Sequence, residues 1–415
     1  MNIIVHRGTQ QIGGTCIELS TKNTRLLLDI GQELPPLNED RIEPKMPLVK
    51  GLYHDDIKAV DAILVSHGHG DHIGLVEHVH PEIPIYIGEK ALRIYNVTAQ
   101  FTGRNEISNP VTYLVSGKEL KIGDFSVTPY LVDHSGFDSY AFLIKAGGKF
   151  IAYTGDFREH GRKKPATGYF KKSIPSGIDA LLIEGTMMSR INETVETEEE
   201  IEQKAFEFMS AKDKPIFVLQ SSTNIDRLVG MYKAAKQSKR IFVIDIYTAH
   251  VLSQLQDSIP QPDKFKDIKV FYPRFLTNRM FETENGAKLM KRFNRFWIGK
   301  EELGNRNDFC MLIRGSMLYD LQGVGNLHGS GLIYSLWSGY RKTHKVKRLL
   351  DYASSISMEI IDLHTSGHAS METIQDVIDT CKPKKIIPVH TEEPELFAGK
   401  FPNAIVAKDG EAIIV

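Results

Sequence analysis

The stretch SHGHGDH, residues 66–72, places three histidines and one aspartate directly after the apolar run AILV at residues 62–65. The apolar run predicts a buried strand, and the alternating glycines predict a tight loop at its end. Imidazole and carboxylate groups together suit zinc, and a cluster this dense can serve two ions. The stretch therefore predicts a metal centre at a strand end and, as a first hypothesis, a two-metal hydrolase. The alternative is a solvated turn that is rich in histidine.

The composition is that of an ordinary globular protein. The 415 residues are 41% hydrophobic and 25% charged, which suffices for two domains or for one domain with a large insertion. With a formal net charge of -1, the chain as a whole does not attract a polyanion, so a nucleic acid would have to bind a local basic surface. Three separate cysteines without a Cys-x-x-Cys pair argue against a thiolate zinc site and favour a reducing compartment. Without a leader pattern or a membrane-length apolar segment, we expect a soluble cytoplasmic protein with no membrane partner.

Short strand-like runs alternate with turns and helical stretches, a pattern that predicts a layered α/β architecture. The composition changes after Arg190, where Thr197 and Glu200 form a capping-box pattern. Residues 198–200, all glutamate, are interpreted as the first turn of that helix. We expect a first domain over residues 1–190, an inserted module over 191–350 and a return segment over 351–415. The cleft between the modules is the expected site.

Further metal ligands are expected at the ends of other predicted strands, because a bridged metal pair needs about six or seven of them. The whole predicted ligand set has seven side chains: His67, His69 and His134 for one ion, Asp71, His72 and His390 for the other, and Asp156 as the bridge. The set leaves room for a shared hydroxide, which would be the nucleophile. We expect two Zn2+ ions, with Mn2+ as the alternative, because nitrogen and oxygen ligands accept both metals.

The order of these motifs resembles that of the metallo-β-lactamase superfamily. IEGT at residues 183–186, HTSGHA at 364–369 and IPVH at 387–390 further resemble motifs A, B and C of the β-CASP nucleases, and the whole chain is similar to ribonuclease J. The resemblance implies a metallo-β-lactamase αββα sandwich with an inserted α/β β-CASP domain. It also implies hydrolysis of RNA phosphodiester bonds.

By this resemblance, Glu184 corresponds to the motif A residue of the family, His368 to the motif B residue and His390 to the motif C residue. A histidine in motif C is typical of RNA-cutting members, whereas DNA-directed relatives have an aliphatic residue there. Asp29 matches the first acidic motif of the superfamily, and its expected role is to order the ligand loop through hydrogen bonds.

Phosphodiester cleavage requires charge neutralisation, a nucleophile and an acid for the leaving oxygen. We predict that His368 is this acid and that Glu184 orients it. Asp71 and Asp156 complete the predicted catalytic residues, because they hold the ions. The alternatives are a structural imidazole at His368 and a simple hydrogen-bond acceptor at Glu184.

Contacts with the substrate are predicted in two loops, which contain His364, Ser366 and Gly367, and Ser221, Ser222 and Arg227. The second loop begins a helix after a strand, where free amides can hold an anion. Two basic stretches, residues 158–172 and 341–348, are predicted to contact backbone phosphates, and solvated faces are the alternative.

The sequence departs from the resembled family after motif C. Thr391-Glu392 follows His390 where Gly-Glu is usual, so local substrate contacts are expected to differ. The chain ends at Val415, whereas full-length ribonuclease J continues into another domain, so assembly driven by that domain is not predicted.

Single-stranded RNA is the expected substrate. The alternatives are a DNA nuclease on the same scaffold, a hydrolase of small esters, thioesters or lactones, and a nucleic-acid-binding protein without catalysis. The sequence does not decide between endonuclease and 5′-exonuclease action, nor whether the chain forms a homodimer.

Overall fold

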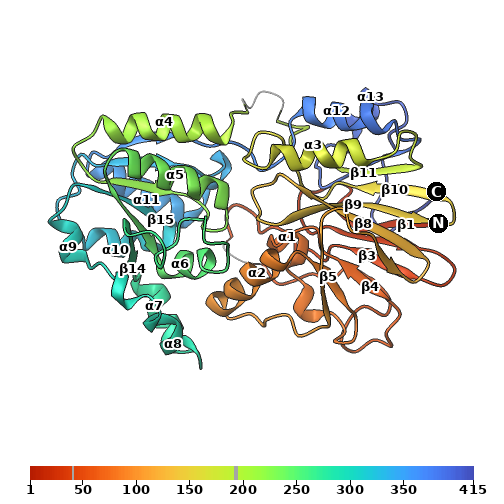
Figure 1. Ribbon diagram of the computed structural model, residues 1–415, viewed down its shortest axis with the longest axis horizontal. Helices are drawn as coiled ribbons and strands as arrows, with labels where there is room; N and C mark the ends of the chain where they lie inside the picture. The colour runs from red at the N-terminus through yellow and green to blue at the C-terminus, as the bar shows by residue number, and fades with distance from the viewer. Residues whose placement is uncertain (40–41, 191–194) are drawn as a thin grey trace.

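The computed structural model describes residues 1–39, 42–190 and 195–415. It has two lobes, and both chain ends lie together at the edge of one of them (Figure 1). The ends meet because the last strand pairs antiparallel with the first. The described residues form three β-sheets, which are the framework of the two lobes.

Two sheets pack face to face in the lobe that holds the chain ends. The strand order of the first is β19 (Ala412–Ile414), β1 (Asn2–Arg7), β2 (Cys16–Ser20), β3 (Arg25–Leu28), β4 (Ala62–Leu64), β5 (Ile85–Ile87) and β6 (Val111–Tyr113). The order of the second is β18 (Ile386–Val389), β11 (Ala180–Glu184), β10 (Lys149–Tyr153), β9 (Ser139–Ala146), β8 (Phe125–Val132) and β7 (Leu120–Ile122). Buried apolar side chains of both inner faces, Leu64 and Phe142 among them, fill the space between the sheets.

Helices cover the outer faces of these two sheets. The first sheet is covered by α2 (Glu89–Thr102), with the short helix α1 (Gly70–Ile73) beside it. The second is covered by α3 (Lys164–Ser173), α12 (Met371–Cys381) and α13 (Pro394–Lys400). The layers confirm the predicted αββα sandwich.

The other lobe is built on a parallel six-stranded sheet. Its order is β14 (Ile268–Phe271), β13 (Ile241–Asp245), β15 (Phe309–Ile313), β12 (Ile216–Leu219), β16 (Gly331–Tyr334) and β17 (Glu359–Asp362). Apolar clusters lie on both faces, so central strands such as β12 are buried throughout. This lobe confirms the predicted α/β insertion.

The helices of the inserted lobe are interspersed with its strands along the chain, beginning with one helix before β12. They are α4 (Glu198–Ser210), α5 (Ile225–Gln237), α6 (Ile246–Leu252), α7 (Arg274–Phe281), α8 (Gly286–Lys291), α9 (Lys300–Gly304), α10 (Leu318–Gln322) and α11 (His344–Ser355). The predicted capping box starts α4: Glu200 N donates to Thr197 Oγ1 at 3.1 Å, and Thr197 N donates to Glu200 Oε2 at 2.7 Å.

The chain returns to the first lobe later than predicted. Helix α11 runs through the expected boundary at residues 350/351, and β17 pairs with β16 of the inserted sheet. The return segment predicted over 351–415 therefore begins too early, because a strand pattern does not reveal which sheet the strand joins. The other predicted boundary, at residue 191, lies outside the described residues and stays a prediction.

Among the helices of the described ranges, none combines the length and apolarity needed to span a bilayer.

Candidate metal centre

The candidate ligands occupy loops at neighbouring strand ends of the sandwich. The loop after β4 carries residues 66–72 and leads into α1. Single ligand candidates follow three strands of the second sheet: His134 after β8, Asp156 after β10 and His390 after β18. In the turn before Asp156, Gly155 has a φ of +53°, and a Cβ there would lie 2.8 Å from the Ser66 Cβ. Glycine therefore allows this turn to pack against the histidine-rich loop.

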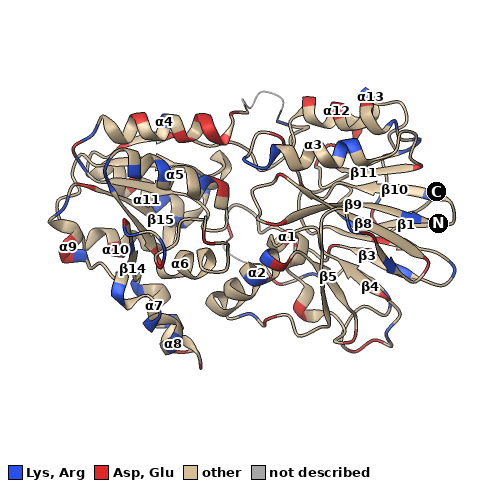
Figure 2. Cartoon of the chain, in the orientation of Figure 1, with Lys and Arg blue, Asp and Glu red and all other residues tan. Residues whose placement is uncertain are grey.

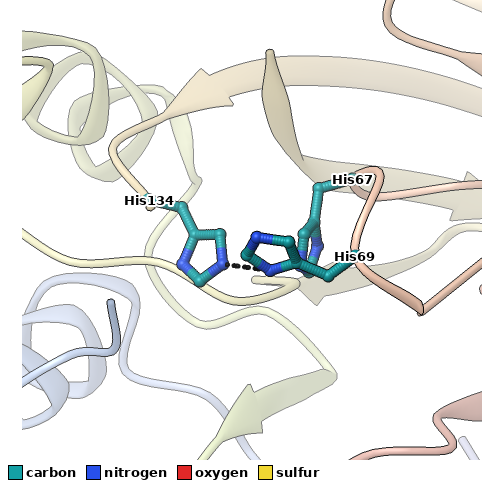
Figure 3. Close-up of side chains that lie close together, drawn as sticks. All are labelled: His67, His69 and His134. Atoms are coloured by element: carbon teal, nitrogen blue, oxygen red, sulfur yellow. Dashed lines mark hydrogen bonds between the residues drawn. The ribbon is translucent and has the colours of Figure 1, made fainter. Parts of the chain in front are cut away.

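Three imidazoles form the first group of ligand candidates (Figure 3). His69 Nδ1 lies 3.0 Å from His67 Nε2 and 3.2 Å from His134 Nε2. Nitrogens bound tetrahedrally to one zinc ion at about 2.0–2.1 Å are separated by about 3.3 Å, so these separations suit a shared ion. Burial lowers the pKa of His67 and of His134 well below the usual range, and the neighbouring histidines lower it further. The rings are therefore neutral, as metal ligands must be.

The second group consists of Asp71, His72 and His390. His390 Nε2 lies 3.2 Å from Asp71 Oδ2. Asp156 lies between the two groups, because its Oδ2 is 3.8 Å from His67 Nε2 and 3.1 Å from His72 Nε2. This position suits a bridging carboxylate.

Two buried atoms in this centre lack a well-aligned hydrogen bond within the described residues: Asp156 Oδ1, and His72 Nε2, which lies 3.1 Å from Asp156 Oδ2. Buried polar atoms of folded proteins are nearly always satisfied. These two atoms, together with the nitrogen and oxygen donors around them, fit a bound divalent metal. The seven side chains lie together as expected, and their individual roles as ligands stay predictions.

Neighbouring polar groups orient these candidates. Asp29 accepts hydrogen bonds from Ser66 N at 2.6 Å and from Tyr153 OH at 2.6 Å, and its Oδ2 lies 2.8 Å from His72 Nδ1. Thr186 Oγ1 lies 2.9 Å from His390 Nδ1. Each contact engages the ring nitrogen that faces away from the centre, which leaves the other nitrogen available for metal. Asp29 thus lies where its expected role requires.

His368 and Glu184 lie beside the second group. His368 Nδ1 is 3.1 Å from Glu184 Oε2 and 3.7 Å from Asp156 Oδ2. Burial disfavours the charged ring, but Glu184 and Asp156 outweigh this effect and raise the pKa of His368 to about 9. The Glu184 carboxylate is fixed in turn by the backbone N–H groups of Phe157 and Ala369, each at 3.2 Å. The pair can therefore hold a proton next to the candidate ligands.

The loop after β17 brings the first set of predicted substrate residues to the centre. Gly367 O lies 2.6 Å from His134 Nδ1, and Ser366 Oγ accepts a hydrogen bond from His368 N at 3.1 Å. These two contacts orient protein groups. His364 Nδ1, in contrast, is buried without a partner among the described residues.

The second set of predicted substrate residues is partly exposed and partly buried. Ser221 is exposed, whereas Ser222 is buried and accepts a hydrogen bond from Thr248 Oγ1 at 2.9 Å. Arg227 is also buried: its Nε donates to Glu198 Oε2 at 2.7 Å, and its other nitrogens contact backbone carbonyls. The expected phosphate contact of Arg227 is thus corrected, because its guanidinium already binds protein groups.

The basic stretch at residues 158–172 also differs from its prediction. Arg158 is fully buried and contacts Asp133 at 3.4 Å, Glu198 at 3.0 Å and Asp226 at 3.1 Å. Within the same stretch, Lys163 pairs with Asp226 at 3.2 Å. Arg158 and Lys163 therefore bind carboxylates of the protein and are not free to contact the backbone phosphates of a nucleic acid.

The contacts of Thr186 with His390 and of Tyr153 with Asp29, and the buried partners of Arg158, were not predicted from the sequence. Thr186 follows Glu184 by two residues in motif A, so its proximity to the site could have been inferred. The pairing of Arg158 with Glu198 has no local signal, because 40 residues separate the two in the chain.

Comparisons with known proteins agree with this geometry. A family model described as the beta-lactamase superfamily domain matches residues 24–202, and one described as the Zn-dependent metallo-hydrolase RNA specificity domain matches residues 355–400. Ribonuclease J 2 of Streptococcus pyogenes is 21% identical over 100% of this chain and 76% of its own length. Ribonuclease J of Mycobacterium tuberculosis is 24% identical, but the match covers only 55% of this chain and 41% of that protein.

The fold is also found in a solved structure. The crystal structure of a protein of unknown function from Enterococcus faecalis V583 has a TM-score of 0.82 and 22% sequence identity to this chain. The match covers 100% of this chain and 99% of that one, so the two share a fold over their whole length.

Proposed function

This chain belongs to the metallo-β-lactamase superfamily and to its ribonuclease J-like β-CASP branch, and from this premise we propose that it is a ribonuclease with two metal ions. The chain is a metal-dependent hydrolase of that branch. The finer proposal is that single-stranded RNA is the substrate and that the reaction takes place in the cleft between the two lobes.

One observation carries the proposal: Asp156 lies between two groups of ligand candidates, and His368, held by Glu184, lies beside them. His67, His69 and His134 would hold one ion, and Asp71, His72 and His390 the other. When bound, two Zn2+ ions (or Mn2+ in their place) would neutralise the charge on the phosphate and activate water for attack.

His368 supplies the acid of the proposed reaction. In the metal-free protein Glu184 and Asp156 raise its pKa to about 9, and Glu184 holds the ring through Nδ1 at 3.1 Å. The opposite nitrogen, Nε2, can then protonate the leaving oxygen of the scissile bond. General-acid catalysis of this kind contributes about 100-fold to 10,000-fold to a rate.

RNA is favoured over DNA by two observations. The segment that contains His368 and His390 matches the RNA specificity model over residues 355–400, and the relatives described above are named ribonucleases. We further propose that the exposed Ser221 and His364, whose Nδ1 has no partner among the described residues, contact the substrate near the centre.

The test is cleavage of matched single-stranded RNA and DNA of one sequence, carrying 5′ or internal labels, by metal-loaded protein. We expect RNA-selective cutting, a loss of at least 100-fold in kcat for His368→Ala with its metal retained, and loss of both metal and activity for Asp156→Ala. Metal content is read by elemental analysis of the same samples. Lys118→Ala, an exposed substitution on the sandwich, is the control.

Preferential cutting of DNA would replace RNA with DNA in the proposal. Failure to cut either polymer would overturn it in favour of a small-molecule hydrolase or a binding protein. The product ladder of the 5′-labelled RNA separates endonuclease from 5′-exonuclease action.

A further inference from the structure

The outer edge of the inserted sheet carries a segment that is far more basic than the rest of the chain. Residues 274–297, which we call the basic–aromatic arm, contain six Lys and Arg residues against two Glu, in a chain of net charge -1. The arm follows the edge strand β14 and comprises α7, α8 and the 3-10 turn η2 (Asn294–Phe296), together with Trp297. Lys and Arg colour both helices where they project from the lobe (Figure 2).

Most cations of the arm have no carboxylate partner among the residues that the structure describes. Four of them are exposed and form no ion pair with the described part of the chain: Arg274, Lys288, Lys291 and Arg292. Arg295, in contrast, pairs with Asp263 at 2.7 Å. Elsewhere, cations such as Lys163 and Arg158 bind carboxylates of the protein. The positive charge of the arm is therefore available to an external anion.

Large aromatic rings lie among these cations. Phe275 is 66% exposed, Phe281 61% and Trp297 56%. Rings of this size are normally buried, and their clustering on a surface marks an interaction site. Arg295 lies 4.6 Å from the centre of the Phe296 ring, so a cation and a ring already stack within the arm.

The arm is held in place at both ends. Tyr272 OH lies 2.9 Å from Met290 O and 3.0 Å from the Asn294 side-chain amide, which ties the strand end to α8 and η2. Ile298 N donates to Val270 O at 3.0 Å, which anchors the far end of the arm to β14. The exposed rings therefore project from an ordered platform.

The arm also reaches the lobe that carries the metal centre. Arg279 of α7 donates a hydrogen bond to Thr102 O, at the end of α2. A chain bound to the arm would thus lie where the two lobes meet, on the outside of the proposed active-site cleft.

We propose that the basic–aromatic arm is a second RNA-binding surface, which holds the single-stranded part of the substrate away from the scissile bond. The inference rests on the proposed ribonuclease function. Exposed rings that stack on bases, alternating with unpaired cations that meet phosphates, are the combination that binds single strands without sequence preference. The arm therefore increases affinity for long substrates and leaves cleavage of short ones unchanged.

Two variants separate the contributions of charge and stacking. The charge variant is Arg274→Ala/Lys291→Ala/Arg292→Ala, and the ring variant is Phe275→Ala/Phe281→Ala, both confined to exposed side chains. The matched controls are Lys22→Ala/Lys58→Ala/Lys118→Ala and Tyr113→Ala, at exposed positions of the sandwich. Circular dichroism and melting curves confirm that each variant is folded.

The probes are 5′-phosphorylated oligoadenylates of about 5 and about 25 nucleotides. The longer probe has more nucleotides than one single-strand binding site covers. Binding is measured by fluorescence anisotropy on metal-loaded protein in a His368→Ala background, which prevents cleavage. Cleavage of both lengths is measured in the otherwise native enzyme.

For the long RNA, we expect the charge variant to bind about tenfold more weakly and to reduce the slope of log affinity against log salt by about 2, because three phosphate contacts are lost. The ring variant binds about tenfold more weakly with an unchanged salt slope. Cleavage of the short RNA by either variant equals that of the controls.

Long-RNA affinities of both variants equal to those of the controls would overturn the inference. Equal losses for the short and the long RNA would also overturn it, because the effect would then lie at the metal centre. If the native enzyme cuts no RNA while the arm variants still lose affinity for the long probe, the ribonuclease proposal fails and the arm remains a single-strand binding surface.

Discussion

The carboxylate of Asp29 accepts hydrogen bonds from several donors and so connects the ligand loop to both sheets. It follows β3 of the first sheet, lies in the left-handed region with a φ of 61°, and receives hydrogen bonds from Ser66 in the loop after β4 and from Tyr153 of β10 in the second sheet. Its contact with His72 Nδ1 directs the Nε2 of that ring toward Asp156. A carboxylate is needed here, because it accepts from all of these donors at once.

Asp29→Asn is therefore expected to weaken metal binding by about 10-fold to 100-fold, the usual effect of changing a partner of a metal-bound histidine. Asparagine tolerates the left-handed backbone, so the fold is expected to survive. The measurement is competition for Zn2+ with a chromophoric chelator. Tyr153→Phe, which removes one donor but retains the carboxylate, is the control and is expected to bind metal nearly as the native protein does. Equal affinities for Asp29→Asn and the native protein would show that Asp29 only supports the fold.

At the scale of elements, the first turn of α4 connects the two lobes. Glu198 is buried there and binds Arg158 of the first lobe at 3.0 Å and Arg227 of α5 at 2.7 Å. Burial opposes its ionisation, but Arg227 and Arg158 lower the pKa of Glu198 from its ordinary value of 4.5 to about 2. The folded state therefore favours the ionised carboxylate more than the unfolded chain does.

The stabilisation by Glu198 is expected to be complete above about pH 4.5 and to disappear as the pH falls through about 2, because the folded pKa is the lower one. Glu198→Gln should cost about 3–5 kcal/mol at pH 7, since it leaves the buried Arg227 without a carboxylate partner among the described residues and removes one of the three carboxylates around Arg158. Urea unfolding of both proteins from pH 7 to pH 3 measures the difference, which should shrink toward acid. Glu199→Gln, at the exposed neighbour, should change stability by less than about 1 kcal/mol. A difference that stays constant across this range would contradict the assignment.

Local sequence patterns correctly predicted those strands and helix starts that depend only on residues close together in the chain. The run AILV before His67 forms β4, and the Thr197–Glu200 capping box starts α4 as expected. The candidate ligands converge because their strands end at the same edge of the sandwich, which the strand-end histidines could indicate. The pairing of β17 with the inserted sheet and the burial of Arg158 could not be predicted, because both depend on partners that only the folded chain brings together. The metal-binding and catalytic roles remain predictions.

At the scale of the whole molecule, Arg158 is the point where the lobes and the His368 loop meet. Its guanidinium binds Asp133 of the sandwich, Glu198 and Asp226 of the inserted lobe, and Ser366 O in the loop before His368. One buried cation thereby fixes the position of the inserted lobe relative to the proposed acid. The two lobes are therefore expected to unfold together.

Arg158→Met should separate the unfolding of the two lobes, because it leaves three carboxylates in the interface without their shared cation. Breaking such buried contacts costs about 3–5 kcal/mol, which corresponds to roughly 5 °C in a chain of this size. Scanning calorimetry should show one transition in the native protein and two in the variant. Arg162→Met, which removes a more exposed pair with Glu202, should keep a single transition. A single, unshifted transition in Arg158→Met would show that the apolar contacts alone couple the lobes.

Metal binding should stabilise the junction between the beginning and the end of the chain. Asp71 and His390 are separated by 319 positions, yet they face each other in one ligand group, and His390 N donates to Gly8 O at 2.7 Å. Saturation at about 1,000 times the dissociation constant would add about 4 kcal/mol to the folded state. Stripping the metal with a chelator should therefore lower Tm and speed amide exchange in the loops after β4, β8 and β18, while β13 of the inserted sheet stays unchanged. Zn2+ should restore both properties in the native protein but not in Asp156→Ala. Identical exchange before and after stripping would mean that the loops are organised without metal and that the centre contributes to chemistry alone.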